Sequence, residues 1–365
     1  MDLRDELQAA LGALYRIDTE LGGGGMSRVF LAEETALGRR VVVKVLPREL
    51  TGGVNVDRFR REIVLAAQLQ HPHIVTLLAT GEVAGVPYYT MPYEEGRSLR
   101  TQLRERGPLP IGEVVGILGD VAKALAYAHD RGVIHRDIKP DNILECGGAA
   151  VVTDFGIAKA VSDAKDVKPP PQTGDTLTQI GMSIGTPTYM APEQAAADPD
   201  VDRRADIYAF GVTAYEMLAG QPPFHDLSPR KLLQAHLTQP PEPVLARRPD
   251  TPPALADLVM RCLAKEAADR PQNAHELVRV LEIVQAGEER AARPASASLA
   301  RRLVAGLVSL VGVSILARAA IVAMRLPEWV LPAALVVAVL VIVTVVGRSA
   351  RVARAATPLT PARRR

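Results

Sequence analysis

Three short stretches of the sequence carry side chains suited to moving a phosphoryl group. Lys44 lies inside the apolar run "VVVKVL", Asp137 and Asn142 lie five residues apart in "VIHRDIKPDNIL", and Asp154 precedes Phe-Gly in "VVTDFGIAK". Phosphoryl transfer to a hydroxyl requires a fixed cation on the phosphates, oxygen ligands for Mg²⁺ and a carboxylate that orients the attacking hydroxyl. The stretches provide a candidate for each of these tasks.

The glycine-rich stretch "ELGGGGMSRVF" provides a candidate for a fourth task, covering the phosphates. Glycine runs are most often linkers or turns, and Ser27 stands where a G-x-G-x-x-G pattern has its third glycine, so the stretch alone decides nothing. Without a Cβ at Gly22 and Gly24, backbone N–H groups can approach phosphate oxygens. Because the other three stretches follow in order, we interpret the glycines as a phosphate loop.

The hydrophobic pattern predicts the elements that must position these residues. Residues 16–91 are rich in strands, marked by β-branched or aromatic runs at 29–34, 39–46 and 86–91, with a helix at 56–69. Helices dominate residues 92–285, and the clear ones, ended by Gly or Pro, are 111–132, 206–220 and 254–271. Residues 1–15 have the pattern of an amphipathic helix. We therefore expect an α+β chain with a small β-rich lobe followed by a larger helical lobe.

Charge and cysteine usage exclude some classes of protein. From residue 290 onward the chain has 12 Arg, no Lys and one acid, Glu328, so this end carries +11. The whole chain carries +2, which leaves −9 for residues 1–289. An acidic body with a basic end does not fit a nucleic-acid-binding protein. Cys146 and Cys262 have neither metal-site spacing nor a disulfide framework, which favours a reducing cytosol for the body.

The motifs occur in the chain order of the protein-kinase signature, and "MAPE" follows them. Over roughly residues 10–285 the sequence resembles the eukaryotic-like (Hanks-type) serine/threonine protein kinases of bacteria. This resemblance implies a two-lobed kinase fold, ATP and Mg²⁺ as cofactors, and transfer of the ATP γ-phosphate to Ser and Thr hydroxyls of proteins. The alternative is a pseudokinase, a catalytically silent scaffold. Pseudokinases usually lack the Lys, the catalytic Asp or the metal-binding Asp, and all three residues are present here.

The resemblance assigns roles to individual residues. Asp137 would orient the substrate hydroxyl, Lys139 would steady the γ-phosphate, and Lys44 would contact the α- and β-phosphates. Glu62 would pair with Lys44, although a surface glutamate on a helix is the alternative. Asn142 and Asp154 would hold Mg²⁺. The implied ATP-binding residues are Leu21, Gly22, Gly23, Gly24, Gly25, Met26, Ser27, Val29, Lys44, Met91, Pro92 and Glu94.

Within that set, the segment that joins the lobes departs from the family at one position. Val29 would cover the adenine and Met91 would lie at the back of its pocket. Pro92 replaces the acidic residue common in the family. Proline loses only its N–H, so the carbonyl that would accept from the adenine amine remains, and the N–H of Glu94 could act as the complementary donor.

The segment between "DFG" and "APE" is long and rich in Pro, Gly, Thr and Asp, which is typical of a regulatory loop. The guanidinium of Arg136, next to the catalytic Asp, requires an anion that a phosphothreonine would provide. Thr178 is the first candidate for autophosphorylation, with Thr176 and Ser183 behind it, and a homodimer could carry out this reaction in trans. The residues expected to support the site are Arg136, His135, Phe155, Thr186, Glu193, Asp206 and Arg270, with Glu193 and Arg270 as an ion pair.

The C-terminal end has the pattern of a membrane anchor. A linker at 286–302 precedes apolar runs at 303–324 and 329–346 and a basic tail at 347–365. The second run has no charge and 12 Leu, Val or Ile in 18 residues, which indicates a transmembrane helix. The first contains Arg318, so spanning competes with lying in the interface. Basic flanks on both sides predict a hairpin in the inner membrane, with the kinase domain and the C-terminus cytoplasmic. A channel or transporter would need more spans.

Overall fold

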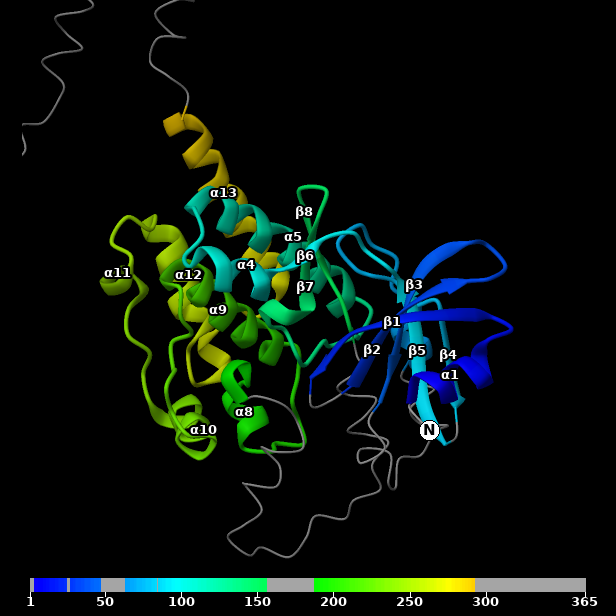
Figure 1. Ribbon diagram of the computed structural model, residues 1–365. Helices are drawn as coiled ribbons and strands as arrows, with labels where there is room; N and C mark the ends of the chain where they lie inside the picture. Colours follow the sequence, from blue (N-terminus) through cyan, green and yellow to red (C-terminus); the bar gives the residue numbers. More distant parts are fainter. Residues whose placement is uncertain (1–2, 25–26, 47–62, 84, 156–186, 293–365) are drawn as a thin grey trace, which may run out of the picture. The chain divides into compact units, whose positions relative to one another are not determined.

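The computed structural model describes residues 3–24, 27–46, 63–83, 85–155 and 187–292. The chain divides into two compact units, 1–288 and 289–365, and nearly all described residues belong to the first. In that unit, strands form the N-terminal part and helices the larger C-terminal part (Figure 1). The predicted two-lobed α+β architecture is therefore confirmed.

The N-terminal part is an antiparallel five-stranded sheet with the order β1-β2-β3-β5-β4. Its strands are β1 (Tyr15–Gly24), β2 (Ser27–Glu34), β3 (Arg39–Val45), β4 (Ala79–Val83) and β5 (Val86–Pro92). Side chains alternate between its faces. Val41 and Val43 of β3 pack with α1 (Leu3–Leu11), while Val42 packs on the opposite face with Ile63, which begins the described part (63–67) of the helix predicted at 56–69.

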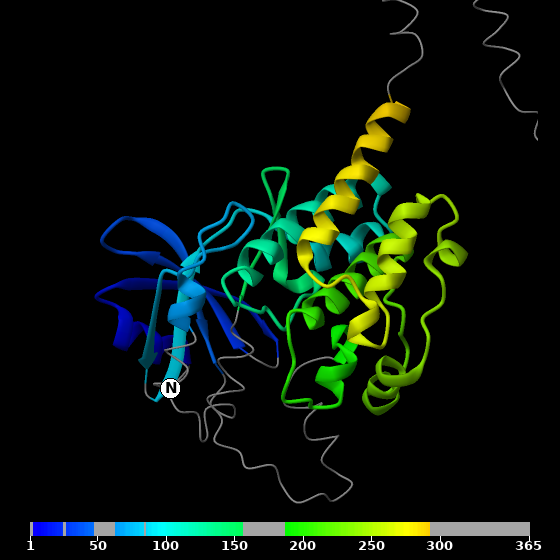
Figure 2. The same ribbon diagram turned by 180° about the vertical axis from the view of Figure 1, so that it is seen from behind.

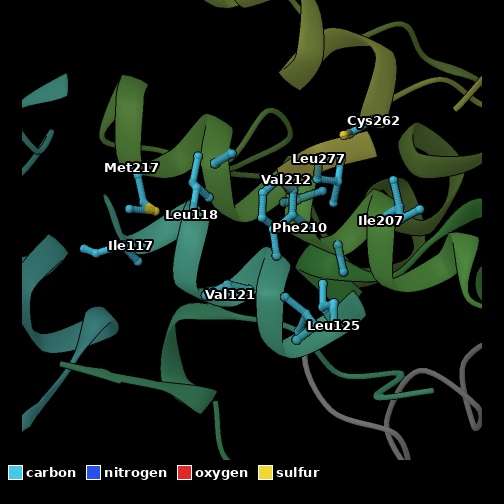
Figure 3. Close-up of a cluster of buried hydrophobic side chains, with 14 of the residues drawn as sticks. Ile117, Leu118, Val121, Leu125, Ile207, Phe210, Val212, Met217, Cys262 and Leu277 are labelled. Carbon is cyan, nitrogen blue, oxygen red and sulfur yellow. The ribbon is translucent and has the colours of Figure 1, made fainter. Parts of the chain in front are cut away.

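The C-terminal part is built around a helix that is buried on all sides. This helix is α9 (Arg204–Ala219), in which every residue from Ala205 to Leu218 is buried. Such a helix forms the centre of a core rather than a surface layer. Its side chains meet those of α5 (Ile111–His129), α12 (Pro253–Cys262) and α13 (Ala274–Ala292), as Figure 3 shows. Figure 2 shows the same helices from behind.

Shorter elements complete this part. The remaining helices are α4 (Leu99–Arg106), α8 (Pro192–Ala195), α10 (Pro229–Thr238) and α11 (Val244–Arg247), and the 3-10 turns are η1 (Pro140–Asn142), η2 (Pro187–Tyr189) and η3 (Ala267–Asp269). A small sheet consists of β6 (Arg97–Ser98), β7 (Ile143–Cys146) and β8 (Ala149–Val152). The η1 turn leads directly into β7, so the small sheet fixes the segment that carries the catalytic motif.

The structure corrects two predicted boundaries. The helix predicted at 254–271 ends at Cys262. Beyond that end, the guanidinium of Arg270 donates to the carbonyl oxygens of Ala264 and Lys265 and satisfies acceptors that no helix pairs. The linker predicted from 286 begins as helix, because α13 continues to Ala292 through Ala, Glu and Arg, which favour helix.

The described residues contain no helix that is both long enough and apolar enough to cross a membrane. The predicted spans at 303–324 and 329–346 and the basic tail at 347–365 lie outside the described residues.

Candidate active site

The sheet register brings three predicted site residues into one row. Val29 of β2 lies opposite Lys44 of β3, and Lys44 lies opposite Tyr89 of β5. Directly opposite residues of neighbouring strands place their side chains on the same face. Lys44 and Tyr89 both reach the side chain of Asp154, which follows β8 in the other part of the molecule.

One carboxylate therefore connects the two parts. Lys44 Nζ donates to Asp154 Oδ2 at 2.6 Å, and Tyr89 Oη donates to Asp154 Oδ1 at 2.7 Å. Burial alone would raise the pKa of Asp154, but the charge of Lys44 and the two hydrogen bonds hold it below its usual value. The buried side chain is therefore an ionised carboxylate.

The backbone around Asp154 is held on both sides. The Thr153 N–H donates to the Asn142 carbonyl at 2.9 Å, and His135 Nε2 lies 2.8 Å from the Thr153 carbonyl oxygen. Phe155 packs edge-on against His135 with the ring centroids 4.6 Å apart, and both residues are buried. Asp154 itself has a φ of 65°, a conformation that its fixed neighbours must maintain.

The catalytic motif gathers around Asp137. Lys139 Nζ donates to Asp137 Oδ2 at 2.7 Å, and Asn142 Nδ2 donates to the same oxygen at 3.1 Å and to the Asp137 carbonyl at 2.8 Å. The Asp137 side chain is 31% exposed, so its carboxylate is accessible to a substrate hydroxyl. Asn142 uses its amide nitrogen here, which leaves its amide oxygen as the atom able to bind a cation.

Asp206 on α9 holds the backbone of this loop through hydrogen bonds. Its carboxylate accepts from the backbone N–H groups of His135 at 2.8 Å and Arg136 at 2.7 Å, and His129 Nε2 lies 2.7 Å away. Burial would raise the pKa of Asp206, but its hydrogen bond to His129 and the charges of His129 and His135 hold it below the usual value. Arg136 has a φ of 68°, so Asp206 stabilises a strained turn just before Asp137.

Arg136 is the expected receptor for a phosphate. Its carbonyl accepts from Gln194 Nε2 at 2.9 Å, while its buried Nε has no hydrogen-bond partner among the described residues. A buried guanidinium nitrogen without a partner is costly. Arg136 can therefore still accept an anion.

The donor set fits Mg²⁺ that arrives with phosphates. Asn142 and Asp154 offer oxygen atoms and are 7% and 9% exposed. Within the described part of the chain, no group of three or more His, Cys, Asp or Glu could hold a metal. Mg²⁺ commonly takes one or two protein oxygens and completes its octahedron with water and substrate phosphates. The two protein oxygens from Asn142 and Asp154 are consistent with this coordination preference.

The described glycines of the glycine-rich stretch lie at the end of β1, where it pairs with the start of β2. Gly22 pairs with Val29, Gly23 with Arg28 and Gly24 with Ser27. Gly22 has a φ of 126°, where a side chain would be strained, so this position requires glycine. Leu21 is exposed and Ser27 is buried.

The predicted joining segment begins at the end of β5. Met91 pairs with Val42 and is 9% exposed, and Pro92 is the last residue of the strand. The next residue, Tyr93, donates its N–H to the Arg40 carbonyl at 3.3 Å, and the Arg40 guanidinium lies 4.2 Å from its ring centroid. Glu94 follows outside any strand and is half-buried.

The supporting ion pair lies where the sequence predicted one. Both Arg270 Nη atoms donate to the Glu193 carboxylate, at 2.7 and 2.8 Å, and Arg270 is 2% exposed. Other predicted residues lie outside the described parts of the chain, so their contacts stay predictions: Gly25, Met26, Glu62, Thr176, Thr178, Ser183 and Thr186.

Sequence reasoning missed Tyr89 and a charged cluster beside the catalytic loop. In the cluster, Arg100 of α4 donates to Glu216 Oε1 at 2.7 Å and to Asp141 Oδ2 at 3.1 Å, and it also contacts the hydroxyl of Tyr189, which donates to Glu216. Tyr89 had no local signal of its role, because its partner Asp154 lies 65 positions further along the chain. Arg100 had none, because its partners are distant in sequence.

Comparison with known proteins finds protein kinases, in agreement with the geometry of the site. Residues 15–281 match the family model described as "Protein kinase domain". Serine/threonine-protein kinase pkn2 of Myxococcus xanthus is 39% identical over 278 residues, which are 74% of this chain and 32% of that protein. Serine/threonine-protein kinase PknB of Mycobacterium tuberculosis is 40% identical over 280 residues, 75% of this chain and 43% of that protein. The chain thus spans less than half the length of these curated relatives.

Proposed function

The chain belongs to the protein kinase family, and from this premise we propose that it is an active serine/threonine protein kinase that uses Mg-ATP. The observation that carries this proposal is the pairing of four motif side chains that come from three segments of the chain. Lys44 contacts Asp154, and Asn142 contacts Asp137. The pseudokinase alternative loses support because no member of the Lys, catalytic Asp and metal Asp set is missing.

The residues divide the work of phosphoryl transfer among them. Asp137 accepts the hydroxyl proton of the substrate Ser or Thr as that oxygen bonds to the γ-phosphorus and the bond to the β-phosphate oxygen breaks. Lys139, 2.7 Å from Asp137, offers positive charge next to the transferred group, and Lys44 binds the α- and β-phosphates. Asn142 and Asp154 would hold Mg²⁺, which neutralises phosphate charge when it is bound.

The test is transfer of labelled phosphate from ATP to a generic basic protein by the full chain. Acid hydrolysis of the product should yield phosphoserine or phosphothreonine, and an Asp137→Asn variant of equal thermal stability should yield neither. Label on tyrosine would contradict the Ser/Thr specificity. Label from the Asp137→Asn variant within tenfold of wild type would contradict the assigned mechanism.

Autophosphorylation in the segment before "APE" is a second part of the proposal. The partnerless Nε of Arg136 supports it, because a phosphate on Thr178, or on Thr176 or Ser183, would supply the missing anion. We expect a homodimer to carry out this step in trans. Mass spectrometry of protein expressed alone should find phosphate in this segment, and protein from the Asp137→Asn variant should lack it. We expect this phosphate to raise activity through Arg136. An unmodified segment, or full activity of Thr178→Ala, would contradict this part of the proposal.

We also propose that the C-terminal end anchors the chain in the inner membrane as a hairpin of 303–324 and 329–346. The support is the sequence alone: apolar runs flanked by Arg on both outer sides, with Pro327 and Trp329 suited to the turn. A cytosol-only fluorescent reporter fused after Arg365 should be active. Alkaline phosphatase activity there instead would show a single span.

A further inference from the structure

The hydroxyl of Tyr89 is a contact of the active site to which no kinase motif assigns a role. The Tyr89 side chain extends from β5 beside Lys44 and donates to Asp154 Oδ1 at 2.7 Å, while Lys44 holds Oδ2. Tyr89 is fully buried in a cluster with Val42 and Met91. A buried phenol needs a hydrogen-bond partner, and here that partner is the predicted metal ligand.

Lys44 and Tyr89, two of the three side chains that donate to the Asp154 carboxylate, differ in how freely they can move. The ammonium group of Lys44 lies at the end of a flexible four-carbon chain, and it is also expected to bind the ATP phosphates. The Tyr89 ring is held by packing on all sides and cannot turn away. The phenol of Tyr89 donates its O–H to Asp154 and acts as an uncharged donor, unlike the cationic ammonium group of Lys44.

A neutral donor on one oxygen is compatible with a cation on the same carboxylate. Each carboxylate oxygen has two lone pairs, so Oδ1 retains one after accepting from Tyr89. The hydrogen bond also restricts rotation about the last bond of the Asp154 side chain, a rotation that is otherwise soft. Hydrogen bonds of this kind to metal-binding carboxylates are worth roughly 10- to 100-fold in metal affinity.

We propose that Tyr89 is a positioning residue that fixes the orientation of the Asp154 carboxylate for Mg²⁺ through its hydroxyl. This inference rests on the proposed function, because it takes Asp154 as a ligand of the metal in Mg-ATP. The opposite role, a latch that withholds Asp154 from the metal, predicts the reverse sign in the experiment below.

The chain offers a matched control one residue away. Tyr89→Phe removes the hydroxyl and keeps the ring. Tyr88→Phe makes the same change in the same strand, but Tyr88 packs on the other face of the sheet with Val41 and Val43. Both tyrosines are buried, so the two variants lose comparable surface and differ in whether Asp154 loses a donor.

The decisive quantity is how much Mg²⁺ strengthens ADP binding to the full-length protein, measured by calorimetry with EDTA and with excess Mg²⁺. We expect the Kd of Tyr89→Phe for metal-free ADP to lie within about twofold of the wild-type value. The factor by which Mg²⁺ strengthens ADP binding should be about tenfold smaller than in wild type. The Mg²⁺ concentration for half-maximal transfer should rise by the same factor, with kcat at saturating Mg²⁺ within about threefold of wild type. Tyr88→Phe should match wild type in every measurement.

Three results would overturn the inference. The enhancement in Tyr89→Phe could stay within twofold of wild type, or it could increase, as a latch requires. ADP binding could weaken equally with and without Mg²⁺, which would indicate a packing role only. If instead wild type itself shows neither Mg²⁺-dependent ADP binding nor transfer, the proposed function is wrong and this inference falls with it.

Discussion

The catalytic loop obtains its hydrogen-bond partners within the helical part of the molecule, whereas Lys44 on the sheet obtains its charged partner from outside the sheet. Asp206 holds the backbone of His135 and Arg136 from a helix that is buried on all sides. Lys44 pairs with Asp154, 110 positions further along the chain. The first arrangement depends only on the packing of one core, and the second depends on how two parts of the molecule meet.

This difference indicates which half of the active site is rearranged when a ligand binds. The backbone of the loop before Asp137 is held by hydrogen bonds to Asp206 within the helical part. The Lys44–Asp154 pair unites the two groups that are expected to receive phosphates and metal, so nucleotide binding must exchange or share that contact. The four predictions below test this contrast, beginning with the largest effect.

Asp206→Asn should do the most damage, because an amide has one oxygen acceptor where the carboxylate receives three donors. We expect the free energy of unfolding to fall by about 3–5 kcal/mol and kcat to fall at least about 100-fold. Thermal melting and steady-state kinetics would measure both. Asp202→Asn is the control, since the Asp202 side chain is 45% exposed and pairs only locally with Arg204. Equal effects of the two changes would contradict a special role for Asp206.

Lys44→Met should have the next largest effect on stability, because it leaves the Asp154 carboxylate buried without its cation. A loss of about 3 kcal/mol is expected, with the protein still folded. Adding Asp154→Asn should restore most of that loss, since the uncompensated charge disappears. Chemical denaturation of the two single variants and the double variant measures the coupling. Additive losses would show that the two side chains do not interact.

His236 in α10 should make the stability of the helical part depend on pH. Burial, together with the charge of Lys265, lowers the pKa of His236 to about 4, and its Nδ1 lies 2.9 Å from the Tyr208 hydroxyl. Because the unfolded chain binds the proton more readily, this contribution is full above pH ~6.5 and is lost as the pH falls towards ~4. It amounts to roughly 2–3 kcal/mol. His236→Gln should flatten the stability profile in that window, as measured by thermal melting across this pH range.

Gly22→Ala should produce the smallest effect and should act on nucleotide binding. A side chain at a φ of 126° costs about 1–2 kcal/mol. The strain should distort the hairpin and raise the Kd for Mg-ATP several-fold. Gly38→Ala also places a side chain at a positive φ, 62°, in the turn between β2 and β3. Its Kd for Mg-ATP should stay at the wild-type value. A rise equal to that of Gly22→Ala would show that the glycine-rich stretch has no specific role in nucleotide binding.

The motif residues were predictable because each lies in a local pattern. Lys44 interrupts an apolar strand, and Asp137, Asn142 and Asp154 have fixed spacings to their neighbours. The strand β4 was not predicted, because it is short and contains Gly81. That glycine is required by its cross-strand partner, since a Cβ there would lie 2.6 Å from the Tyr88 ring.

Contacts that depend on strand pairing or on the packing of distant helices left no local signal. The role of Tyr89 follows from the β3–β5 register, which brings Lys44 opposite it. Arg100 donates to Glu216, 116 positions away, and Arg270 donates to two carbonyl oxygens just after the end of α12. In each case the residue type was visible, but its partner was set by the folded core.

The most direct test of the kinase assignment is the rate of phosphate transfer from Mg-ATP to a Ser/Thr protein substrate by full-length wild type, Lys44→Met and Asp154→Asn. Lys44 serves the phosphates from the sheet and Asp154 serves the metal from the helical part, so each variant removes transition-state stabilisation from one side. Both should remain folded and lose at least about 100-fold in rate. Activity within tenfold of wild type in either folded variant would contradict the assignment.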